Sequence, residues 1–162
     1  MAMTELAAAT RREPDPCGLN GWLWLVFAAV LAGLAWHLFV LKETTALFTG
    51  AEAETFLATA EPALYQLSML EIFVSGCLIL ANLVLIGIFF TRHRQFPAAF
   101  IMVALFSVAW VIADALLYRS IVPADPMIDA QNGRELARAA LCALVLVPYM
   151  LVSKRVKATF VF

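Results

Sequence analysis

Four long apolar stretches separated by short polar segments dominate the pattern of this sequence. A helix needs about 20 mostly apolar residues to cross ~30 Å of hydrocarbon, and each of the four stretches meets that requirement. The polar segment between the first and second stretches is the longest of the connections, whereas the one between the second and third is tight. The pattern therefore predicts four transmembrane helices, at residues 21–41, 64–91, 97–122 and 136–153.

The composition places the chain among integral membrane proteins. Of its 162 residues, 64% are hydrophobic and 14% are charged, whereas a typical soluble domain is about 45–50% apolar and about 25% charged. A soluble fold of this size cannot bury so much apolar surface, and the net charge of −1 offers no polybasic field to hold a nucleic acid. These values exclude a soluble enzyme, a disordered chain and a nucleic-acid binder, and they predict the lipid bilayer as the main partner.

The fold class expected is all-α, an integral membrane bundle of four transmembrane helices. Lys and Arg favour cytoplasmic loops, and a cytoplasmic N-terminus places seven of the eleven basic residues on that side. Both termini are therefore predicted to be cytoplasmic, with tails at residues 1–20 and 154–162 around a transmembrane domain at 21–153. The basic residues expected to anchor the cytoplasmic face are Arg92, Arg94, Lys154, Arg155 and Lys157.

Two local features refine this picture. In the first outer loop, residues 50–60 are helix formers, and Ala51, Phe56, Leu57 and Ala60 can share one side, which predicts a short amphipathic helix on the membrane face or capping the bundle. Near the inner end of the fourth span, Pro148 is expected to bend the helix or to free a carbonyl, because proline has no N–H to donate.

Four ionisable residues lie inside the predicted spans, one in each, and such residues inside a membrane indicate function by default; a further one, Arg119, interrupts the third span near its end. All four lie in the outer half of the bilayer under the proposed topology. At about 100° per residue, those of the second, third and fourth spans each lie on a narrow polar stripe that should face the bundle interior. The polar stripes also contain the amide of Asn82 and the phenol of Tyr118. The candidate binding or structural cluster is therefore His37, Glu71, Asn82, Asp114, Tyr118 and Arg138.

Two interpretations of this cluster stay open. In the structural one, which we favour because desolvated charges are normally paired, Arg138 is clamped by Glu71, Asp114 or both through its five donors. In the functional one, the cluster forms the base of an outward-facing cavity that binds a small ligand or passes a proton. Two acids against one arginine leave a net negative charge that favours a cation or a proton.

The sequence contains no motif for catalysis or for cofactor binding. It has no His-x-x-x-His or Cys-x-x-Cys pair, no phosphate-binding glycine loop and no nucleophile motif. Its three cysteines, Cys17, Cys77 and Cys142, are too scattered for a zinc site. We therefore expect no enzyme activity, no metal and no cofactor.

Two end motifs resemble those of a known family. They are GLNGWL at residues 18–23 and PYMLVSKRVKATF at residues 148–160, and they are similar to the entry and closing signatures of the domain-of-unknown-function 2569 family of small bacterial inner-membrane proteins. The resemblance implies a four-helix membrane fold in a bacterial inner membrane. It also matches Glu71, Asp114 and Arg138 to the family's intramembrane polar positions, and it implies no reaction.

The function expected from the sequence is that of a small accessory or interaction subunit of the inner membrane, with a structural charged cluster. Its partner would be another membrane protein or a second copy of the chain. The alternative is a transporter-like or sensor protein that uses the same cluster to bind a small ligand or a proton.

Overall fold

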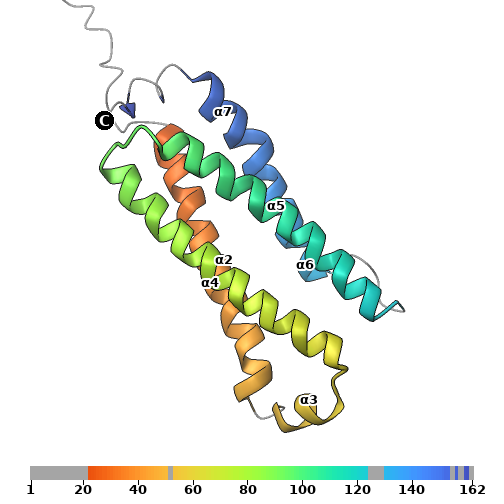
Figure 1. Ribbon diagram of the computed structural model, residues 1–162. Coiled ribbons are helices and arrows are strands. Elements are labelled where there is room, and N and C mark those ends of the chain that lie inside the picture. Colours follow the sequence, from red (N-terminus) through yellow and green to blue (C-terminus); the bar gives the residue numbers. More distant parts are fainter. Residues whose placement is uncertain (1–21, 51–52, 124–129, 154–155, 157–158, 161–162) are drawn as a thin grey trace, which may run out of the picture.

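The computed structural model describes residues 22–50, 53–123, 130–153, 156 and 159–160, and its regular elements are all helices (Figure 1). The described part contains four helical stretches long and apolar enough to cross a membrane, which confirms the predicted fold class at that level. The elements in chain order are α2 (Trp22–Thr49), α3 (Ala53–Thr59), α4 (Pro62–Phe90), α5 (Phe96–Ile121), α6 (Ala130–Leu141), the π-helical turn η1 (Cys142–Leu146) and α7 (Val147–Val152).

Successive long helices run antiparallel and pack side by side, α2 against α4, α4 against α5, and α5 against α6. The stacked rings of Phe27 and Phe89 and the close approach of Gly33 to Asn82 define the register between α2 and α4. The helix α3 links α2 to α4 at the end of the bundle opposite the α4–α5 turn (Figure 1). The four spans therefore enclose one interior that runs along the length of the bundle.

A regular seam on α2 shows which side faces this interior. Buried positions recur at alternating steps of three and four residues, the spacing typical of packed antiparallel helices. The opposite faces of the long helices carry exposed Leu, Val, Ile and Phe, as expected where lipid is the surrounding solvent. The seam residues on α2 are Leu23, Val26, Val30, Gly33, His37, Val40 and Thr44.

Aromatic packing closes the bundle beside the α4–α5 turn. Phe89 is 1% exposed, and its ring centroid lies 5.1 Å from that of Phe27 and 5.2 Å from that of Phe96. Phe160 stacks on Phe96 at 4.7 Å, so the segment after α7 returns to this end. Each aromatic pair contributes about 0.5–1.5 kcal/mol beyond its buried area. This aromatic plug makes one end of the interior apolar and tightly packed.

The helix α2 continues to Thr49, beyond the predicted end of the first span at Leu41. The hydroxyl of Thr45 donates to the carbonyl of Leu41 at 2.6 Å, and that of Thr49 donates to Thr45 at 3.1 Å. The hydroxyl groups of these threonines thus find hydrogen-bond acceptors within the helix, and Thr44 extends the buried seam. The charged residue Lys42 therefore does not end the helix. The other long helices, α4 and α5, end within two residues of their predicted bounds.

The loop after α2 contains a helix, but a shorter one than the sequence pattern suggests. The helix α3 covers Ala53–Thr59, and Phe56 packs edge-on against Phe48 at 5.5 Å. Leu57 is 56% exposed, whereas the predicted position Ala51 lies outside the described residues. An amphipathic role at the membrane face stays a prediction.

The helix that contains the fourth span begins at Ala130, before the predicted start of that span at residue 136, and it is not a uniform α-helix. Its middle is the π-helical turn η1, which ends two residues before Pro148. Proline cannot donate to the carbonyl four residues earlier, and a wide π turn is one way to accommodate that loss. The disturbance expected from Pro148 therefore takes the form of a π turn just past the middle of the span.

The turn between α4 and α5 is tight, as the sequence predicts. Arg92 adopts a positive φ of 53°, and the amides of Arg92 and His93 donate to the carbonyls of Phe89 and Ile88 at 3.1 Å. A left-handed residue at this position is a common way to end a helix. Of the predicted cytoplasmic anchor, Arg92 and Arg94 lie in this turn, whereas Lys154, Arg155 and Lys157 lie outside the described residues.

Candidate functional site

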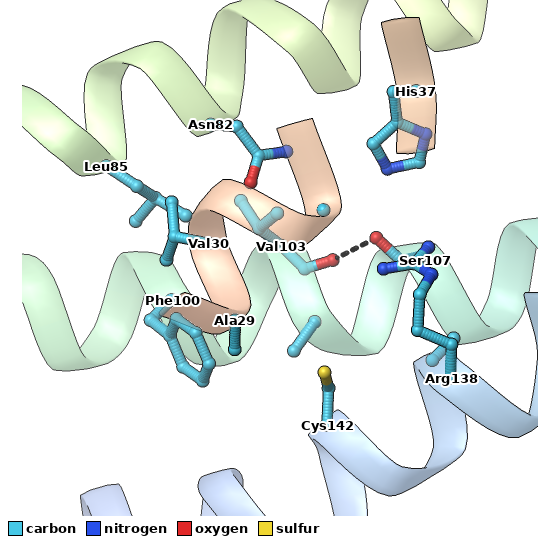
Figure 2. A pocket seen from close by; sticks show the side chains of 13 residues that line it. Ala29, Val30, His37, Asn82, Leu85, Phe100, Val103, Ser107, Arg138 and Cys142 are labelled. Carbon is cyan, nitrogen blue, oxygen red and sulfur yellow. Dashed lines mark hydrogen bonds between the residues drawn. The ribbon is translucent and has the colours of Figure 1, made fainter. Parts of the chain in front are cut away.

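A cavity of about 40 Å³, lined by both apolar and polar side chains, lies between α2, α4, α5 and the fourth span (Figure 2). We call it the chamber. At roughly 10–15 Å³ for each water molecule, this volume has room for about three waters. Val30, Leu85 and Phe100 form its apolar side. The polar or small residues that line it are Gly33, His37, Asn82, Ser107, Arg138 and Cys142.

Gly33 creates the space on the α2 side of the chamber. A Cβ atom built at Gly33 would lie 3.2 Å from Oδ1 of Asn82 and 3.8 Å from Nη1 of Arg138. Without that atom, α4 and the guanidinium of α6 both approach the backbone of α2. One turn further along the seam, His37 is 3% exposed and also lines the chamber. The seam of α2 thus supplies both an opening and a polar group.

Two neutral side chains of the chamber use their own helices as partners. Asn82 is 4% exposed, and its Nδ2 donates to the carbonyl of Leu78 at 2.8 Å. The hydroxyl of Ser107 donates to the carbonyl of Val103 at 2.9 Å (Figure 2). Each bond satisfies one donor within the helix, and Asn82 keeps a second N–H on Nδ2.

Arg138 does not form the predicted clamp. In the described part of the chain it makes no ion pair with Glu71 or Asp114, and its Nε and Nη2 atoms are buried without a hydrogen-bond partner. Its guanidinium instead lies over the ring of Trp36, with Cζ 5.4 Å from the ring centroid. The acid with the strongest electrostatic effect on Arg138 is Glu135, three residues earlier on α6.

Arg138 does not reach the predicted acids because the residues lie at different positions along the bundle. Arg138 lies at the level of Gly33 and Asn82. Glu71 precedes Asn82 by eleven residues on α4, which is roughly 16 Å at 1.5 Å per residue. An arginine side chain does not span that distance. The residues share a helix face, as predicted, but they lie at different depths.

The acids form a second polar group nearer α3, which we call the acidic layer. The carboxyl group of Glu71 lies near Thr44 and interacts electrostatically with Asp114 and Glu135, and Asp114 also interacts with Glu135. Thus α2, α4, α5 and α6 each contribute one residue. No group of three His, Cys, Asp or Glu residues suited to a metal ion is found in the described ranges.

The structure therefore divides the predicted cluster. His37, Asn82 and Arg138 meet in the chamber, whereas Glu71 and Asp114 belong to the acidic layer. Tyr118 follows Asp114 by one turn on α5 and does not line the chamber.

The sequence pattern indicated some of the other residues of these groups. Ser107 lies on the same predicted polar stripe as Asp114, and Gly33 forms a small-residue pair with Ala29 that permits close helix approach. Sequence reasoning missed Glu135, because the fourth span was expected to begin after it. It also missed Trp36, which packs beside the seam, and Thr44, which follows the predicted end of the first span.

A family model described as "Protein of unknown function (DUF2569)" matches residues 16–161, which is nearly the whole chain. No curated protein and no solved structure matches the chain.

Proposed function

The chain belongs to the DUF2569 family, and we propose that it is a multi-pass membrane protein that binds a small polar ligand in the chamber. The observation that supports this function is the guanidinium of Arg138, which lines the chamber beside Gly33 and forms no ion pair with an acid in the described part of the chain. A charged group that is removed from water without a partner is strongly disfavoured. Ionisable groups at such positions mark ligand or ion sites in membrane proteins.

The absent clamp changes which of the two functions the geometry favours. The accessory-subunit hypothesis treated the charged residues as a structural device in which Arg138 neutralises Glu71 or Asp114. Because Arg138 contacts neither acid, that reason no longer applies. A transporter-like or sensor protein with an internal binding site accounts for the cavity and for the unpaired guanidinium together. Binding without catalysis fits the side chains that line the chamber.

We also propose that the end of the bundle with the aromatic plug faces the cytoplasm of a bacterium. Arg92 and Arg94 lie in the turn at this end, and Val156 and Phe160 pack there. In the sequence, Lys154, Arg155 and Lys157 are close neighbours of Val156. Lys and Arg concentrate on the cytoplasmic side of inner-membrane proteins. Fusions of alkaline phosphatase to residues 50 and 162 test this orientation, with activity expected only at residue 50.

The binding function is tested by ligand-induced stabilisation of the purified protein in nanodiscs. The panel consists of anionic, neutral and cationic solutes of up to about four heavy atoms, the size that a cavity with room for about three waters accepts. At least one solute should raise the unfolding temperature saturably, because a ligand that binds only the folded state stabilises it.

Gly33→Ala should remove this stabilisation, because the new Cβ narrows the chamber. Gly76→Ala is the matched control, since no atom lies within 4 Å of the position of its new Cβ. A wild-type protein that no member of the panel stabilises would contradict the function, as would equal responses in the two variants.

A further inference from the structure

We infer that the ligand of the chamber is a small monovalent anion, such as chloride or formate, held by Arg138. This inference rests on the proposed function of the chamber and specifies the chemistry of its ligand. It differs from the expectation from sequence, in which two acids against one arginine favoured a cation or a proton.

The charges around the chamber favour an anion. Arg138 supplies a formal positive charge, and none of the described residues that line the chamber is acidic. Glu71 and Asp114 lie nearer α3, so they are not contact partners of the guanidinium. Glu135 acts on Arg138 from one helical turn away without forming an ion pair with it. A guanidinium that is removed from water without a paired anion is strongly disfavoured, and a bound anion supplies the missing charge.

The orientation of the guanidinium leaves one nitrogen for the ligand. Nε and Nη2 are enclosed, and the ring of Trp36 covers one face of the group. Nη1 instead lies beside the space that Gly33 leaves open, and Figure 2 shows the guanidinium extending toward Ser107 and His37. Charge-assisted hydrogen bonds from such a donor are roughly twice as strong as neutral ones. Trp36 therefore positions Arg138, and Nη1 is the donor to the anion.

The size of the chamber selects among anions. A volume of about 40 Å³ accepts a halide or an oxyanion of three or four heavy atoms, because it corresponds to about three water molecules. A free ion matches this volume, whereas the phosphate of a lipid headgroup with its attached glycerol exceeds it.

Iodide quenching of Trp36 fluorescence tests this inference directly, because the indole lies against the guanidinium that would hold the ion. The protein is used in nanodiscs with Trp22, Trp24 and Trp110 replaced by Phe. We expect a saturable component of quenching by iodide that chloride and formate displace. Arg138→Gln should weaken the apparent iodide affinity about tenfold or more, which corresponds to one charge-assisted hydrogen bond.

Three further variants make the result specific. Arg134→Gln, an exposed arginine one turn earlier on α6, removes the same charge and should leave quenching unchanged. Glu135→Gln should strengthen iodide binding, because it removes the acid that competes for Arg138. Arg138→Lys retains the positive charge and should retain a saturable component, which keeps the test valid if Arg138→Gln does not fold.

Each alternative outcome is informative. Quenching that never saturates, or that is the same with and without Arg138, would overturn the anion assignment. If neutral or cationic solutes stabilise the protein through Gly33 but iodide does not bind, the chamber is a binding site and only the anion assignment fails. If no small solute binds at all, the proposed function fails with it.

Discussion

Replacing Arg138 by Met separates the clamp predicted from the sequence from the arrangement that the structure shows. The substitution retains an unbranched side chain in the same space but removes the positive charge. It also removes two buried nitrogens that have no hydrogen-bond partner. This change should lower the free energy of unfolding if Arg138 belongs to a buried ion pair, and raise it if Arg138 is an unpaired binding group.

The expected magnitude follows from the contacts of Arg138. Removing two unsatisfied donors should raise the free energy of unfolding by about 1–3 kcal/mol for each donor. The lost cation–π contact with Trp36 costs at most about 2 kcal/mol, and the lost attraction to Glu135 on the same helix costs about 0.5 kcal/mol. We therefore expect Arg138→Met to raise the free energy of unfolding by about 2 kcal/mol. A gain of this kind is typical when buried charges are replaced by apolar side chains of similar volume.

The assay is reversible unfolding in mixed micelles with increasing SDS, followed by circular dichroism. The buffer contains only large anions, because a chamber-bound ion would stabilise the wild-type protein selectively. Arg134→Met on the exposed side of α6 is the matched control and should change stability by less than about 0.5 kcal/mol.

A loss of about 3–5 kcal/mol in Arg138→Met would refute this reasoning, because that is the cost of breaking a buried ion pair. A second measurement tests the pairing itself. The double-mutant cycle of Glu71→Gln and Arg138→Gln should give an interaction energy below about 0.5 kcal/mol, as expected for residues without contact. A large favourable interaction energy would restore the clamp.

The same unfolding assay checks three further predictions. Gly33→Ala should lower stability by about 1–3 kcal/mol through overpacking against Asn82 Oδ1, 3.2 Å from the new Cβ, whereas Gly76→Ala should raise it by about 0.5–1 kcal/mol; the same sign for both would contradict the packing described. Phe89→Ala should cost about 3–5 kcal/mol because the ring is buried at the centre of the aromatic plug, and a loss below about 1 kcal/mol would show that the plug is loosely packed. Arg92→Gly should stabilise the protein by about 1 kcal/mol, because a positive φ of 53° is strained for arginine and not for glycine; a destabilised variant would indicate that the arginine side chain makes compensating contacts.

The four-helix architecture follows from local properties of the sequence. Apolar length identifies a membrane span without reference to any other part of the chain, and the polar stripes mark the inward faces because charged groups avoid lipid. Asn82 and Arg138 were predicted to lie on such faces, and both line the chamber. Helical periodicity therefore predicted the angular position of these residues around each helix.

The depth of each residue in the bundle could not be predicted from the sequence, because depth depends on the axial position of each helix relative to its neighbours. The predicted clamp failed for this reason, since Arg138 meets Gly33 and Asn82 instead of Glu71. The early start of α6, which brings Glu135 into the bundle, depends on contacts with α5 and not on hydropathy.

Apolar length and periodicity thus determine that this chain forms four spans with polar inner faces, because both properties belong to single helices. The registers between helices decide which polar groups meet, because they are set by side-chain packing between segments distant in the chain. That packing separates the acidic layer from the chamber and leaves the guanidinium of Arg138 without an acid in contact.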